Sequence, residues 1–179
     1  RWKKRARSIV TVVAALLLLA ASGAAIAKIA LPAENPAYRL SPIPLATKEY
    51  REGIFCYQRD NKEGLAKGLA HFNRAIELDP KFVMAYNGLF ETFIAGERFG
   101  LTPQETAAQL RTLARILMSL APDLAEAQAA RAWLDFTEFK WAEAEPRFQR
   151  AIKLNPKCAI AHMRYGFCLT FVGRPDDGY

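Results

Sequence analysis

The chain has 179 residues and a formal net charge of +7, and about half of its residues are apolar. This is enough for one core built from repeats but not for two large independent domains. Five of the basic residues lie within the first seven positions, and from Ser8 onward 20 basic residues nearly balance 18 acidic ones, so the charge gives no support for nucleic-acid binding by this segment.

The N-terminal part of the chain has the pattern of a membrane anchor. Residues 1–7 form a basic flank, and residues 8–27 contain no charge. A helix of that length spans about 30 Å, the thickness of a bilayer's hydrocarbon core. We therefore predict a transmembrane helix over residues 8–28, in contact with the lipid bilayer, with residues 1–7 in the cytoplasm and the rest of the chain on the periplasmic or extracytoplasmic side.

A cleaved signal peptide is the alternative for the same residues. The basic start, the apolar middle and the small residues of Ala25-Ile26-Ala27 fit that pattern, and cleavage would release a secreted, periplasmic protein. The length of the apolar stretch favours an anchor. The chain begins with Arg1 rather than Met, so we also expect more protein upstream.

A proline-rich linker is expected over residues 29–47. Four prolines fall in it: Pro32, Pro36, Pro42 and Pro44. Proline removes backbone donors and disfavours helix in the residue before it. The sequence thus predicts an extended spacer between the membrane and the next domain.

Helical periodicity begins at Lys48 and then repeats. The segments FNRAIELDP (72–80) and FQRAIKLNP (148–156) align without a gap, and both end an amphipathic pattern at a proline. Residues 62–78 and 141–154 are therefore predicted helices. In each copy a small residue is followed four residues later by phenylalanine, as in Ala144 and Phe148. Such internal self-similarity is typical of stacked helical repeats.

At these residues the chain resembles the tetratricopeptide repeat (TPR) family, whose unit is a 34-residue helix–turn–helix. The resemblance implies an all-α fold: a TPR-type solenoid of about three and a half repeats over residues 48–179, after one N-terminal transmembrane helix. The expected repeats are residues 48–82, 83–124, 125–158 and 159–179.

The second and fourth repeats depart most from the pattern. The second is about eight residues too long, and its second helix carries Leu110 and Ala114 where a small residue and an aromatic are usual. That helix should begin with a cap at Thr102 and end at Leu120. The fourth lacks its second helix, so we expect the natural chain to continue beyond Tyr179.

No motif for catalysis, cofactors or metals is present in the sequence, so we expect neither an enzyme nor a bound cofactor. His71 and His162 lie on different repeats. Three cysteines, Cys56, Cys158 and Cys168, are expected to be buried, unpaired residues. Carboxylates on the later helices are expected on solvated faces: Asp135, Glu138, Glu143 and Glu145.

The resemblance implies a binding site on the inner surface formed by the first helices of successive repeats, where TPR proteins take peptides. The corresponding residues here include an apolar, aromatic strip and two residues, Asn87 and Arg164, that match the family's clamp for peptide C-termini in kind. The expected groove comprises Asn87, Glu91, Glu126, Trp133, Phe136, Met163, Arg164 and Phe167, with Ala129 and Phe171 as further positions.

Three functions are compatible with these patterns. The first is a membrane-anchored scaffold that binds a protein or peptide, of unknown identity, on the non-cytoplasmic side. The second is the sensor half of a larger signalling protein, because the arrangement is similar to bacterial proteins in which a winged-helix DNA-binding domain or a Ser/Thr kinase domain precedes one membrane span and a TPR array. The third is a secreted TPR protein.

Overall fold

The computed structural model describes residues 35–175, and this part of the chain is built from helices alone. The fold class expected from the sequence, all-α, is confirmed for it, since no strand lies between residues 35 and 175. The basic flank, the predicted membrane helix and residues 29–34 of the predicted linker lie outside the described residues. The elements in chain order are η1 (Pro36–Tyr38), α2 (Pro44–Tyr57), α3 (Lys62–Leu78), α4 (Val83–Gly96), η2 (Glu97–Phe99), α5 (Pro103–Leu120), α6 (Ala125–Thr137), α7 (Trp141–Leu154) and α8 (Ala159–Phe171).

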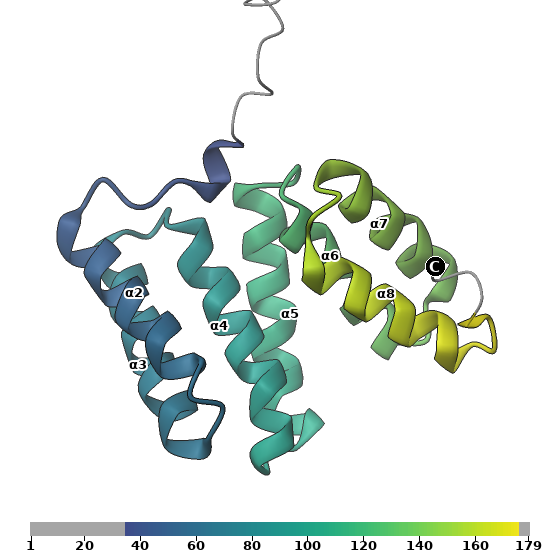
Figure 1. Ribbon diagram of the computed structural model, residues 1–179, viewed down its shortest axis with the longest axis horizontal. Coiled ribbons are helices and arrows are strands. Elements are labelled where there is room, and N and C mark those ends of the chain that lie inside the picture. The colour runs from purple at the N-terminus through teal and green to yellow at the C-terminus, as the bar shows by residue number, and fades with distance from the viewer. Residues whose placement is uncertain (1–34, 176–179) are drawn as a thin grey trace, which may run out of the picture. The chain divides into compact units, whose positions relative to one another are not determined.

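Neighbouring helices pair along the chain. Helix α2 lies against α3, α4 against α5, and α6 against α7, while α8 contacts both α6 and α7. Figure 1 shows these pairs side by side in chain order, from α2 and α3 at one side to α8 at the other. The first helices of the pairs also meet one another, because α2 contacts α4, α4 contacts α6, and α6 contacts α8.

The helix ends are set by local sequence. Asn61 precedes α3 and accepts a hydrogen bond from the backbone N–H of Gly64 at 2.7 Å. Thr102 and Glu105 form a reciprocal capping box at the start of α5, in which the Glu105 carboxylate accepts from the Thr102 N–H at 2.6 Å. The predicted helices over residues 62–78 and 141–154 are α3 and α7, and the predicted cap and end of α5 are also confirmed.

The linker prediction was wrong over its last part. Helix α2 begins at Pro44 rather than Lys48, because proline is well suited to the first turn of a helix, where its missing N–H leaves no bond unmade. Residues 36–38 form a 3-10 turn instead of an extended spacer. The described part of the predicted linker is therefore partly helical.

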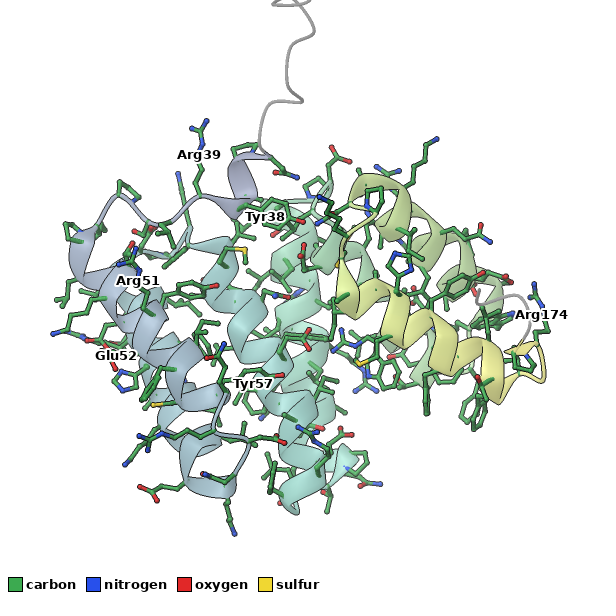
Figure 2. The ribbon with its side chains drawn as sticks, in the orientation of Figure 1. Tyr38, Arg39, Arg51, Glu52, Tyr57 and Arg174 are labelled. Carbon is green, nitrogen blue, oxygen red and sulfur yellow. The ribbon has the colours of Figure 1, made fainter. Side chains whose placement is uncertain are left out.

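The segment before α2 also lies on the helical domain. The Tyr38 hydroxyl donates to Glu126 Oε2 at 2.8 Å, and Asn155 Nδ2 donates to the same hydroxyl at 3.0 Å. Asn35 Nδ2 donates to the Asp123 carbonyl at 2.9 Å. Figure 2 places Tyr38 near the upper ends of the helices. These bonds connect the segment to the turn before α6, to the first turn of α6 and to the residue that follows α7.

The two aligned phenylalanines fill the spaces between helices. Phe72 and Phe148 are both fully buried. A Cβ atom built on Gly53 or Gly88 would lie 2.7 Å or 2.5 Å from the Phe72 ring, so glycine is needed for α2 and α4 to approach α3 this closely. Phe148 packs in a cluster with Ala132, Ala144 and Cys168, and its ring stacks on Tyr165.

Candidate functional site

An aromatic strip lies across α6 and α8. We define it as Trp133 and Phe136 on α6 with Phe167 and Phe171 on α8. Ring centroids are 5.8 Å apart for Trp133 and Phe136 and 5.8 Å apart for Trp133 and Phe167. The centroids of Phe136 and Phe171 are 5.4 Å apart. The spacing of three residues on α6 and four on α8 places each pair on one helix face, so the four rings form one continuous surface.

Much of this strip is open to solvent. The exposed fraction is 55% for Phe167 and 68% for Phe171, whereas Trp133 and Phe136 are half-buried. Met163, one turn before Phe167 on the same helix, is 62% exposed. Three large apolar side chains on successive turns of α8 therefore face water next to two half-buried aromatic rings.

A buried ion pair adjoins the strip. Arg164 Nη2 donates to Glu91 Oε2 at 2.8 Å, and only 3% of the Arg164 side chain is exposed. The guanidinium carbon lies 5.3 Å from the Phe90 ring centroid and 5.5 Å from that of Trp133. Cation–π attraction at these distances helps to hold the desolvated cation in place. Trp133 thus belongs both to the strip and to the surroundings of Arg164.

Several polar atoms around this ion pair have no hydrogen-bond partner among the described residues: Asn87 Oδ1, Glu91 Oε1 and Arg164 Nη1. Desolvation raises the pKa of Glu91, and the charge and hydrogen bond of Arg164 oppose that rise. The Arg164 side chain is nearly inaccessible and is already paired with Glu91. It is therefore poorly placed to bind the terminal carboxylate of a peptide.

The structure links five of the eight predicted groove residues by direct contacts: Glu91, Trp133, Phe136, Arg164 and Phe167. Trp133, Phe136 and Phe167 come together in the strip, Met163 extends it along α8, and Glu91 pairs with Arg164. Asn87 lies one turn before Glu91 on α4. Glu126 lies at the start of α6 and accepts the hydrogen bond from Tyr38, so part of its carboxylate is occupied by the chain itself.

Two features were missed or misjudged from the sequence. The Glu91–Arg164 ion pair joins residues 73 apart, and no local pattern indicates it. Asp135 was expected on a solvated face, which is wrong: it is 1% exposed and accepts a hydrogen bond from Arg131 Nη2 at 2.6 Å. Arg131 lies four residues before Asp135, and this spacing was the signal in the sequence that Asp135 could have a charged partner when buried.

The remaining polar side chains of residues 35–175 bring together no metal site, since no three His, Cys, Asp or Glu residues there converge as ligands. The two histidines are apart: His71 Nδ1 lies 2.8 Å from Glu49 Oε2, and His162 Nε2 lies 3.0 Å from the Pro156 carbonyl oxygen. All three cysteines are free and buried, as predicted.

The aromatic strip can offer a ligand apolar and aromatic contacts.

Comparison with models of protein families gives no match, and no curated protein matches the chain.

Proposed function

We propose that this chain is a TPR-type solenoid that binds a protein or peptide partner through the aromatic strip and Met163. The aligned segments 72–80 and 148–156, the pairing of successive helices and the contacts between first helices support a repeat architecture. In this proposal the chain acts by binding and performs no catalysis.

The observation that supports binding most strongly is the exposure of α8. Soluble proteins rarely leave several large apolar side chains adjacent and exposed unless a partner or another part of the same chain covers them. Aromatic residues are also the side chains that most often dominate binding energy in protein interfaces. Phe167, Phe171 and Met163 meet both conditions, and the half-buried Trp133 and Phe136 supply a rigid base beneath them.

Selection of peptides from a random displayed library against the 179-residue chain tests this proposal. We expect selected peptides to carry apolar or aromatic anchors and to lose about tenfold or more in affinity on Phe167→Ser, because that change removes an exposed anchor without altering the core. The matched control is Phe139→Ser, which changes a phenylalanine that is 88% exposed and makes no ring contact with the strip. Failure to enrich any peptide, or equal loss with both variants, would argue against the strip as the binding surface.

We further propose that residues 8–28 anchor the chain in a membrane and that the repeats lie on the non-cytoplasmic side. The uncharged stretch and its basic flank support this. Within residues 35–175 none of the helices has the length and apolar character required to span a bilayer. Extraction of cell membranes with alkaline carbonate, followed by N-terminal sequencing, separates the alternatives: retention of the uncleaved chain supports an anchor, whereas a soluble chain starting at Lys28 supports a cleaved signal.

A further inference from the structure

A second surface, distinct from the aromatic strip, is rich in arginine. It is a pocket of about 460 Å³ between α5, α6 and α7, which we call the arginine pocket. Four arginine residues from three helices line it. Its lining residues are Arg111, Thr112, Arg115 and Met118 of α5, Arg131 of α6, Glu138 just after α6, and Arg147 of α7.

A buried carboxylate holds two of these arginines. Asp135 receives a hydrogen bond from Arg131 Nη2, and Arg147 Nε lies 2.9 Å from Asp135 Oδ2 on its other side. The contact between Arg147 and Asp135 is an ion pair without a hydrogen bond, since neither Arg147 Nε nor Asp135 Oδ2 has a hydrogen-bond partner among the described residues. Both arginine side chains are about one-third exposed, so water reaches part of each of them.

Glu138 orders a third arginine at the rim. Its carboxylate accepts from Arg111 Nε at 2.9 Å and from Lys140 Nζ at 2.6 Å. Arg111 still has its two terminal nitrogens free of ion pairs among the described residues, since only Nε is engaged. The two carboxylates, Asp135 and Glu138, therefore accept hydrogen bonds from only some of the N–H donors of these arginines.

Arg115 lines the pocket but has no interaction within the described part of the chain that would account for a charged residue there. It is exposed, it lies one turn after Arg111 on the same helix face, and it makes no ion pair or hydrogen bond within residues 35–175. Placing four arginines together against two carboxylates leaves an excess of positive charge. Like charges at one-turn spacing on a helix repel each other, and a bound anion would relieve that repulsion.

We propose that the arginine pocket binds a phosphate group. Arginine presents a planar fork of N–H donors that matches phosphate oxygens, and several forks around one pocket suit a tetrahedral anion with more oxygens than a carboxylate. The Thr112 hydroxyl supplies a further donor at the wall. The phosphate comes either from a free phosphate compound or from a phosphorylated side chain of a protein.

Calorimetric titration of the 179-residue chain at low salt tests this with two probes. Sodium pyrophosphate represents a free phosphate compound, and a phosphoserine peptide, compared with its unphosphorylated form, represents a protein source. We expect saturable binding of at least one probe, weakening as salt is added. Stronger binding of pyrophosphate assigns a free compound, and stronger binding of the phosphopeptide assigns a modified protein.

Arg115→Ala should weaken binding at least about fivefold, because a charge-assisted hydrogen bond is lost without disturbing any internal ion pair. Arg115→Lys should restore only part of the affinity, since lysine keeps the charge but not the fork. The matched control is Arg51→Ala, which removes the same charge from an exposed arginine on α2, away from the pocket (Figure 2). Absence of saturable binding to either probe, or equal weakening by Arg115→Ala and Arg51→Ala, would overturn the proposal.

Discussion

Arg164 and Glu91 form a buried ion pair that joins α8 to α4, with a separation of 2.8 Å between Nη2 and Oε2. The two helices belong to different helix pairs, and α5, α6 and α7 lie between them in the chain. The bond therefore fixes the position of α8, and with it the position of Phe167 and Phe171, relative to the preceding helices. The guanidinium is also in contact with Trp133 of the aromatic strip.

Breaking this ion pair should destabilise the domain strongly. Arg164→Met leaves a buried carboxylate without its partner, and we expect a loss of about 3–5 kcal/mol in the free energy of unfolding at pH 7. The double variant Glu91→Gln, Arg164→Met should be less damaging, because no unpaired charge remains. Urea denaturation measures both. The exposed pair Arg74–Glu77 supplies the control, since Arg74→Met should change stability by less than about 1 kcal/mol. A loss no larger for Arg164→Met than for Arg74→Met would refute the role of the ion pair.

Phe148 should contribute to stability as a packed core residue. It is fully buried between α6, α7 and α8, so Phe148→Ala should lower the free energy of unfolding by about 3–5 kcal/mol through lost contacts and the cavity left behind. Phe139→Ala removes the same atoms from an exposed position and should have almost no effect. Thermal denaturation of the two variants would give similar midpoints only if Phe148 were not packed as described.

Two glycines should respond to alanine in opposite directions. Gly88→Ala puts a methyl group 2.5 Å from the Phe72 ring, so overpacking should destabilise the domain by about 1–3 kcal/mol. Gly166→Ala meets no atom within 4 Å in the middle of α8 and should stabilise it by about 0.5–1 kcal/mol, because alanine is the better helix former. Urea denaturation compares them, and a neutral Gly88→Ala would show that α3 and α4 are further apart than described.

Glu138 should make stability depend on pH at the acid end. Hydrogen bonds from Lys140 and Arg111 lower the pKa of its carboxyl from a usual 4.5 to about 2. The folded state therefore favours the ionised form, and the stabilisation is complete above pH 4.5 and is lost as the pH falls toward 2. The partners are largely exposed and screened by solvent, so we expect about 1 kcal/mol or less.

The comparison of wild type with Glu138→Gln isolates this effect. The difference in their free energies of unfolding should be largest near pH 7 and should shrink between pH 5 and pH 3, as measured by urea denaturation. The control is Glu52→Gln, a change at an exposed carboxylate on α2 that makes no ion pair within the described residues (Figure 2). A difference for Glu138→Gln that stays constant over this range would contradict the assignment.

Features encoded within a few residues could be predicted from the sequence. The bounds of α3 and α7 follow from apolar periodicity and from the prolines after Asp79 and Asn155, and the start of α5 follows from Thr102 and Glu105. The two aligned phenylalanines, Phe72 and Phe148, are both buried, as their equivalent places in two copies of one pattern imply.

Features that depend on distant helices could not be predicted. The second charged neighbour of Asp135 is Arg147 from the next helix, and the partner of the buried Arg164 is Glu91 from α4. The segment around Tyr38 reads as a spacer because of its prolines, yet its hydrogen bonds go to Glu126 and Asn155. For the candidate site, the sequence placed aromatic residues on α6 and α8, but it could not show which of them stay exposed.

The most direct test of the aromatic strip uses Trp133 as a reporter at its centre. The chain contains three tryptophans, and replacing Trp2 and Trp141 with phenylalanine leaves Trp133 as the only tryptophan, which can be excited selectively. Addition of a peptide selected against the chain should then change the emission of Trp133 in a saturable way, and Phe167→Ser should weaken that response about tenfold. Saturable binding of the peptide by calorimetry, with no change in Trp133 emission, would contradict the account.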